Sequence, residues 1–229
     1  MGRILRLMSL CAVILCVGTI LLIAGCGGGG GGTRFRLVNA VPDESALDVL
    51  VDSTTVSSNI AYGTSNGYVA VQSGSHQVAI EPSGTTTALL QQSITFASGS
   101  DTTIVSSNYS SNIANLVLTD DNSAPDSGKF RLRVVNAAPG LGPADVYIVA
   151  PATDLNSVSP TLSNLAFGGT TSYQSVTAGS YEVVLTPVGQ KFTAIDTGSV
   201  AFSSGQVRTF VSLNSQSGGF SYALLHDVN

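Results

Sequence analysis

Few side chains of this sequence have the types and spacing that catalysis requires. The 229 residues include 2 His, His76 and His226. One Gly-x-Ser-x-Gly pattern occurs, at residues 63–67, but no convincing amphipathic helix follows it, and a nucleophile turn requires one. Asp43 and Glu44 are adjacent carboxylates, but neighbours in a loop do not provide the fixed separation at which an acid and a base act on one bond. We therefore predict no enzyme and no cofactor, with His76 on a strand surface and the two carboxylates in a solvated loop.

One acidic run carries the oxygen ligands that Ca²⁺ prefers. It contains Asp120, Asp121, Asn122 and Asp126 within seven residues. The run does not follow the EF-hand pattern, because Ala and Pro stand where that loop needs a ligand and a glycine. We expect a plain acidic linker without metal, with a Ca²⁺ site as the weaker alternative.

The charge balance excludes nucleic acid as a partner. The chain has 9 Lys and Arg against 14 Asp and Glu, a formal net charge of −5. Binding to phosphate backbones requires clustered Lys and Arg, which this chain lacks. Charged residues make up only 10% of the chain and hydrophobic ones 43%, so the composition favours a folded protein over disorder.

The first residues are typical of a secretory signal. Arg3 and Arg6 precede an apolar run over residues 7–22, which is shorter than the ~20 residues a helix needs to cross a bilayer. A positive start, a short apolar run and small residues before a cleavage point indicate a segment that is removed. We expect residues 1–25 to be this signal.

Residues 23–26, Ile-Ala-Gly-Cys, resemble the lipobox of bacterial lipoproteins. The resemblance implies cleavage before Cys26, a diacylglyceryl group on its thiol and a further fatty acid, such as palmitate, on the new amine. Each buried CH₂ contributes ~0.8 kcal/mol, and two or more chains hold a protein stably on a membrane. An uncleaved membrane anchor and cleavage without lipidation are the alternatives.

Glycines occupy residues 27–32 and predict a flexible tether, so that 26–32 is the lipidated Cys and its tether. Gly27 replaces the Asp associated with inner-membrane retention, and the resemblance therefore favours the outer membrane of the cell envelope. Cys11 and Cys16 leave with the signal, so no disulfide is expected in the mature chain.

The remaining chain contains two copies of one sequence repeat. Val-Asn-Ala at 38–40 returns at 135–137, and further blocks follow in the same order, including Tyr68 and Tyr173. Ordered blocks at nearly constant spacing indicate an internal repeat. We predict units at 33–122 and 129–229, joined by a polar, turn-rich linker at 123–128.

Within each unit, apolar residues recur at every second position. Leu47, Val49 and Val51 alternate with their neighbours, and Gly or Ser-Gly separates the short β-branched runs. This pattern predicts an all-β chain of two tandem antiparallel β-sandwich domains, Ig-like or transthyretin-like. We expect the shared apolar positions, with Tyr68 and Tyr173, to form the core.

The block Val-Val-Asn-Ala-Ala-Pro at 134–139, followed by Ala-Asp-Val-Tyr-Ile at 144–148, is similar to the signature of the bacterial domain-of-unknown-function family number 4397. Later blocks at 181–183 and 209–211 fit the same family. The resemblance implies two copies of a secreted or envelope β-sandwich, at 33–122 and 129–229, and it implies no activity.

The residues of this motif suit a folding role. The prolines end a strand because they lack an N–H, the asparagines bond nearby backbone, and the aspartates accept N–H bonds in the same loop. The motif comprises Asn39, Pro42 and Asp48 in the first unit and Asn136, Pro139 and Asp145 in the second. A ligand site shared by both copies is the alternative.

These observations predict a non-catalytic, lipid-anchored envelope module that binds a protein or glycan partner through sheet faces, loops or exposed edges. The alternative is an envelope hydrolase or a regulatory subunit of one. A cluster of unlike polar residues in one cleft, present in only one of the two units, would favour that alternative.

Overall fold

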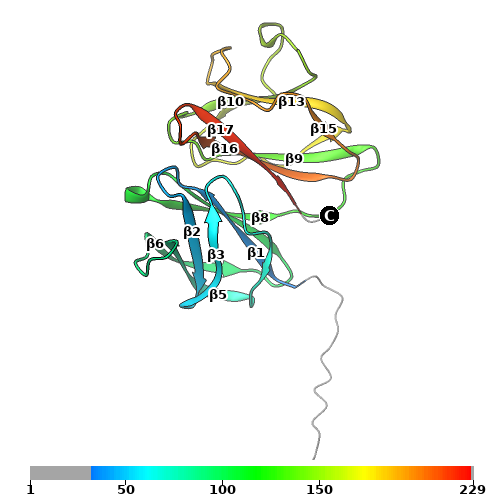
Figure 1. Cartoon of the computed structure of the whole chain (residues 1–229). Coiled ribbons are helices and arrows are strands. Elements are labelled where there is room, and N and C mark those ends of the chain that lie inside the picture. Colours follow the sequence, from blue (N-terminus) through cyan, green and yellow to red (C-terminus); the bar gives the residue numbers. More distant parts are fainter. Residues whose placement is uncertain (1–31, 228–229) are drawn as a thin grey trace, which may run out of the picture. The chain divides into compact units, whose positions relative to one another are not determined.

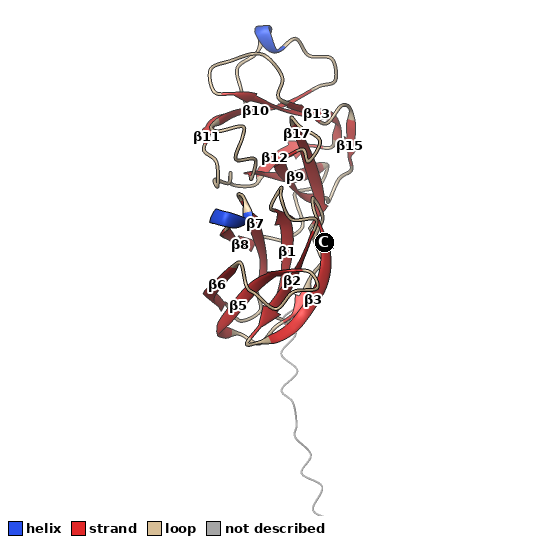
Figure 2. Ribbon diagram, turned by 60° about the vertical axis from the view of Figure 1, so that its left-hand side comes forward, coloured by secondary structure: helices blue, strands red, loops and turns tan. Residues whose placement is uncertain are grey.

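The computed structural model describes residues 32–227, which belong to one compact unit (Figure 1). The predicted signal, Cys26 and the tether up to residue 31 lie outside the described residues. Helix within 32–227 is limited to two single 3-10 turns, η1 (Ser110–Asn112) and η2 (Leu155–Ser157) (Figure 2). No helix of this part is long and apolar enough to cross a membrane. The prediction of an all-β chain is confirmed.

Residues 32–122, here called the N-half, form two sheets. The inner N sheet has the order β4 (Val69–Ala70), β1 (Arg34–Ala40), β7 (Asp101–Ser107) and β8 (Ala114–Asp120). The outer N sheet has the order β3 (Thr54–Ala61), β2 (Ala46–Val51), β5 (Gly74–Pro82) and β6 (Leu90–Phe96).

Residues 129–227, the C-half, repeat this order of strands. The inner C sheet is β12 (Gln174–Thr177), β9 (Lys129–Asn136), β16 (Val207–Asn214) and β17 (Phe220–His226). The outer C sheet is β11 (Leu162–Leu165), β10 (Ala144–Val149), β13 (Gly179–Pro187) and β14 (Ile195–Asp196), and β15 (Val200–Phe202) also pairs with β13.

The sheets are not purely antiparallel, and this part of the prediction is wrong. The pairs β1–β7 and β9–β16 are parallel, while the other strand pairs are antiparallel. Parallel neighbours need a long crossover. Here the chain leaves β1, builds the outer sheet, and returns to enter β7 in the same direction as β1.

Three apolar clusters hold the layers together. One contains residues of both N sheets, such as Phe35 and Ile80, and a second contains residues of both C sheets, such as Phe130 and Leu185. A third joins the two inner sheets, where Val105 lies in one cluster with residues of β9, β16 and β17. The order of layers is therefore outer N, inner N, inner C, outer C, as the ribbons of Figures 1 and 2 also show.

The stacking of the inner sheets buries both faces of β1. The sequence pattern assigns one face of this strand to solvent, but Arg36 is only 2% exposed and Val38 is fully buried. A strand buried on both faces cannot show a clean alternation of apolar and polar residues. One face of β1 therefore packs inside the N-half, and its other face packs against the inner C sheet.

Candidate functional site

A buried cluster of four polar side chains lies at one end of the inner N sheet. Tyr68 and Thr103 each donate a hydroxyl hydrogen bond of 2.6 Å to Oδ2 of Asp120. The guanidinium of Arg36 lies 4.7 Å from the centroid of the Tyr68 ring, and its Nε donates to Thr103 Oγ1 over 2.8 Å. Arg36 and Thr103 are direct partners in the parallel β1–β7 pair, so the strand register sets their contact.

The C-half contains the equivalent cluster. Tyr173 and Thr209 each donate a hydroxyl hydrogen bond of 2.8 Å to Oδ2 of Asp227. The guanidinium of Arg133 lies 4.8 Å from the Tyr173 centroid, and Arg133 pairs with Thr209 in the parallel β9–β16 register. Each half thus presents one Arg and one Asp beside a Tyr and a Thr.

Each ion pair joins an arginine of one half to an aspartate of the other half, and we call these the exchanged ion pairs. Arg36 binds Asp227, and Arg133 binds Asp120 over 2.6 Å. Each guanidinium also donates to a main-chain carbonyl in the last strand of the other half, at 2.9 and 3.4 Å. Such reciprocal contacts are those of a two-fold interface between like subunits. Here the interface lies inside a single chain.

Burial and pairing fix the protonation of this interface. Burial disfavours the charge of Arg36, but Asp227 beside it raises the guanidinium pKa above its usual value. Burial raises the pKa of the Tyr68 and Tyr173 hydroxyls, so both remain hydrogen-bond donors at neutral pH. The two carboxylates are fully buried and act as acceptors, which gives this cluster a structural role rather than an acid–base one.

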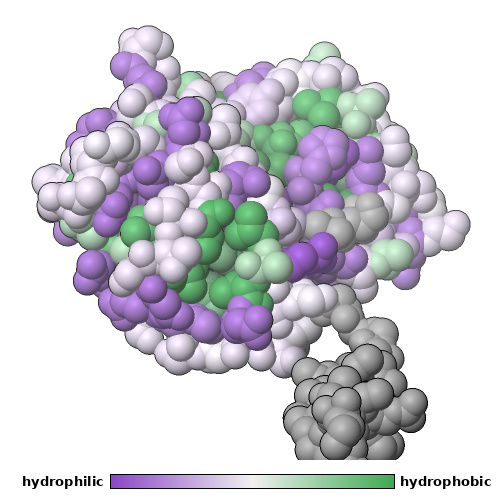
Figure 3. Space-filling view, turned by 60° about the horizontal axis from the view of Figure 1, so that its bottom comes forward, coloured by the Kyte–Doolittle hydropathy of each residue, from purple (hydrophilic) through white to green (hydrophobic). Residues whose placement is uncertain are grey.

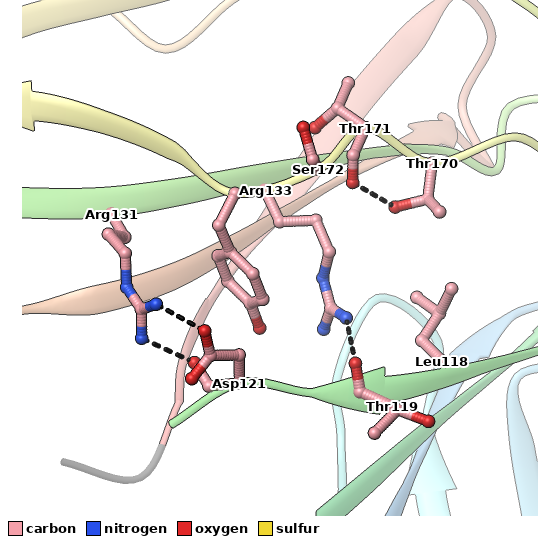
Figure 4. A pocket seen from close by; sticks show the side chains of 9 residues that line it. Leu118, Thr119, Asp121, Arg131, Arg133, Thr170, Thr171 and Ser172 are labelled. Carbon is pink, nitrogen blue, oxygen red and sulfur yellow. Dashed lines mark hydrogen bonds and ion pairs between the residues drawn. The ribbon is translucent and has the colours of Figure 1, made fainter. Parts of the chain in front are cut away.

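A pocket of about 410 Å³ opens next to the C-half cluster, at the junction of the two halves (Figure 4). Its size suits one or two sugar rings or a small organic ligand. It is lined by Leu118, Thr119, Asp121, Arg131, Arg133, Thr170, Thr171, Ser172 and Tyr173.

The charges of the pocket are already paired. Arg131 binds Asp121 over 2.6 Å and lowers the pKa of that carboxyl to about 2. Arg133 is held by its buried carboxylate partner. Thr171 accepts the Val134 N–H at 3.0 Å, which leaves its hydroxyl proton free to donate. The lining therefore has no unpaired charge and can form hydrogen bonds with a ligand.

The asparagines of the repeated motif, Asn39 and Asn136, lie fully buried near the ends of β1 and β9. Asn39 Nδ2 donates to the carbonyls of Glu44 and Ile60, and Asn136 Nδ2 donates to those of Gly142 and Leu165. Each side-chain oxygen accepts the N–H two residues on, at 3.1 and 3.4 Å. Both side chains therefore tie the strand end to the next loops. Pro42 lies two residues after the end of β1, and Pro139 lies three residues after the end of β9.

The aspartates of the motif accept backbone N–H groups, but not those of the loop where we expected them. Asp48 accepts the N–H of Asn59 at 2.7 Å, and Asp145 accepts those of Asn164 and Gly189 at 2.9 and 2.8 Å. Both asparagines have positive φ, 57° each, where the neighbouring strand is irregular. The carboxylates thus stabilise a strained irregularity within β3 and β11 of the outer sheets.

The acidic run does not gather around one point. Asp120 and Asp121 bind arginines of the C-half, Asn122 Nδ2 donates to Asp101, and Asp126 binds Lys129 at 3.0 Å. Residues 32–227 contain no group of three or more His, Cys, Asp or Glu side chains that could hold a metal ion. The oxygen ligands of the weaker Ca²⁺ alternative point to different partners.

The remaining candidates also have separate partners. On β5, His76 places its Nδ1 2.6 Å from Oδ2 of Asp52, which follows β2. Asp43 accepts the N–H of Ser110 at 2.9 Å. His226, on β17, supplies its carbonyl to Arg36. Tyr68 and Tyr173, expected in the core, are half-buried at the interface instead. Sequence reasoning missed the exchanged ion pairs, although both their arginines and their aspartates recur in the repeat.

Comparison with known proteins finds nine similar chains among solved structures and no match among curated proteins. A family CBM26 module of Eubacterium rectale Amy13K, solved in complex with maltoheptaose, is similar at a TM-score of 0.28 and 8% identity. The alignment covers 86% of this chain and 97% of that chain. A TM-score this low does not establish a shared fold, so the architecture rests on the sheets described above.

The family model described as "Domain of unknown function (DUF4397)" matches residues 33–147. The match is a single span that crosses the junction and ends within β10, where we expected separate copies ending at residue 122 and beginning at residue 129. It contains both Val-Asn-Ala blocks, at the ends of β1 and β9. The match covers half of the chain, and this protein therefore belongs to the DUF4397 family.

Proposed function

We propose that this protein is a non-catalytic binding module of the bacterial cell envelope, anchored in the outer membrane by lipid on Cys26. Its two tandem units, at 33–122 and 129–229, form a rigid body. The pocket between them binds a neutral stretch of a glycan. The observation that carries this proposal is the pocket lining, which combines hydroxyl groups with guanidinium groups whose charges are already paired.

The tandem arrangement is supported by three features of the described residues. The inner sheets have the same strand order with one parallel pair each. Each half has its own apolar core between its two sheets. The polar clusters of the halves contain the same four residue types at equivalent positions.

A neutral glycan fits the pocket better than an anion or an apolar ligand. The lining includes both donors and acceptors, and Asp121 would repel an anion approaching Arg131. Large apolar side chains are mostly buried, and the face drawn in Figure 3 combines hydrophobic patches with hydrophilic residues around them. Sugar hydroxyls can exchange hydrogen bonds with such a lining at little cost in desolvation.

Removal of a pocket hydroxyl tests the glycan proposal. Ser172→Ala should weaken binding of neutral cello-, xylo- or chito-tetraose about three- to tenfold, because one hydrogen bond contributes about 0.5–1.5 kcal/mol. Ser93→Ala, which removes an exposed hydroxyl that contacts Ser75, serves as the matched control. Titration calorimetry measures both. Equal affinities of the two variants would place the sugar elsewhere, and saturable binding of none of these sugars would contradict the glycan assignment.

Replacement of the predicted lipidation residue tests the anchor. Cys26→Ala should move the protein from the membrane fraction to the soluble fraction and abolish incorporation of radiolabelled palmitate, because two or more acyl chains provide the membrane affinity. Cys16→Ala lies in the predicted signal and should change neither readout. Continued membrane retention of Cys26→Ala would show that another segment holds the protein.

A further inference from the structure

Arg208 is a buried cation without an ion-pair partner. Its residue is 8% exposed. Within residues 32–227, its guanidinium makes no ion pair, and the charge of Asp227 acts on it without a direct contact. Arg34, Arg36, Arg131 and Arg133, in contrast, each bind a carboxylate directly. The guanidinium faces a pocket, so it is partly removed from water without a direct counter-charge, which costs free energy. A ligand that supplies the missing negative charge would offset that cost.

This side chain lines a second pocket, which is separate from the proposed glycan site. The pocket has a volume of about 390 Å³ and is lined by Ser204, Gly205, Gln206, Arg208, His226 and Asp227. Arg208 and His226 are direct partners in the antiparallel β16–β17 pair, so their side chains leave the inner C sheet on the same side. The turn between β15 and β16 supplies the opposite wall.

The other lining groups can donate hydrogen bonds. Ser204 Oγ accepts the Gly128 N–H at 3.0 Å, which leaves its proton free. Gln206 Oε1 accepts the Ser203 N–H at 3.1 Å, which leaves its amide NH₂ group free. The carboxylate of Asp227 is fully buried and occupied by Arg36, Tyr173 and Thr209. The net charge that the pocket presents to a ligand is therefore that of Arg208.

Two lining residues of this pocket, Arg208 and His226, occur in only one half of the chain. The repeat aligns Arg208 with Thr102 and His226 with Thr119, so the N-half has neither the cation nor the imidazole. The polar residues that both halves share build the interface between them. Residues found in a single half are not required by that shared architecture, which favours a ligand as the reason for their presence.

We infer that this pocket binds an oxyanion group, with the guanidinium of Arg208 as its principal contact and Ser204, Gln206 and His226 as hydrogen-bond donors. Guanidinium groups match the planar, two-oxygen edge of carboxylate and phosphate groups. The inference does not depend on the proposed glycan site, because the two pockets share no lining residue.

The two imidazoles of the protein allow a direct test. Inorganic phosphate, acetate and glucuronate are titrated separately into the protein at constant ionic strength, and the ¹H–¹⁵N imidazole signals are followed by NMR. At least one anion should shift the His226 signals saturably in the millimolar range. The His76 signals, which arise from a histidine paired with Asp52, should not move. Comparison of the three anions separates a phosphate ligand from a carboxylate ligand.

Two variants complete the experiment. Arg208→Met should reduce the affinity at least tenfold, since it removes the cation of this pocket, whereas Arg208→Lys should retain part of the binding. Lys191→Met removes a positive charge elsewhere in the C-half, where Lys191 contacts Tyr147 and Val158, and should leave the titration unchanged. No saturable shift at His226, equal shifts at His76, or an unchanged titration of folded Arg208→Met would each overturn the inference.

Discussion

Arg36→Met should lower the free energy of unfolding by about 3–5 kcal/mol, because breaking a buried ion pair leaves the other charge uncompensated. Asp227, the partner of Arg36, is fully buried, and the methionine would offer it no donor. The variant would also remove the hydrogen bond to Thr103. Urea unfolding followed by circular dichroism measures the loss.

Arg34 provides the matched control for this prediction. It lies two residues earlier on β1 and also stacks on Tyr68, but its carboxylate partner, Asp101, belongs to the same half. Its side chain is 34% exposed, so Arg34→Met should cost no more than about 1 kcal/mol. The double variant Arg36→Met/Asp227→Asn should lose less than the sum of its single variants, because both remove one interaction. Equal losses for Arg36→Met and Arg34→Met would mean that the exchanged pair adds nothing to the interface.

The sequence predicts the outer sheets better than the inner ones. Leu47, Val49 and Val51 alternate with more exposed residues, as β2 does in the structure, because one face of its sheet meets solvent. Alternation fails on β1 and β16, where almost every residue is buried. Period-two patterning reports a half-buried strand, and it cannot foresee that a second sheet covers the other face.

The exchanged ion pairs escaped prediction for a related reason. Arg36 and Arg133 occur at equivalent places in the repeat, and so do Asp120 and Asp227, so the sequence contains the signal that they act together. The sequence alone favours an acidic linker for Asp120, because its neighbours are also acidic. Which arginine binds which aspartate depends on how the two halves stack. The pair Arg36–Asp227 joins residues that are 191 positions apart in the sequence.

Internal repetition separates structural from functional polar residues in this protein. Tyr, Thr and Asp recur in both halves and satisfy one another at the interface. Arg208 and His226 occur in one half and line a pocket. A residue needed to fold a unit is needed in both copies, whereas a ligand site is needed only once.

Asn136→Ala should destabilise the protein by about 3 kcal/mol or more, since each buried group left without a hydrogen bond costs about 1–3 kcal/mol. Asn136 is fully buried, and four hydrogen bonds end on its side chain, two of them donated to the carbonyls of Gly142 and Leu165. Alanine would leave those carbonyls unpaired inside the protein. Thermal or urea unfolding measures the effect.

The matched control is Asn156→Ala, at an exposed position in η2 whose side chain contacts only Asp154, and it should change stability by less than about 0.5 kcal/mol. Glycan and anion binding, measured on the folded fraction of Asn136→Ala, should be unchanged, because Asn136 lines neither pocket. If stability were preserved while ligand binding was lost, the repeated Asn-Ala-x-Pro motif would be a recognition site. In that case the two halves would be equivalent binding units, and the functional asymmetry argued from Arg208 would not hold.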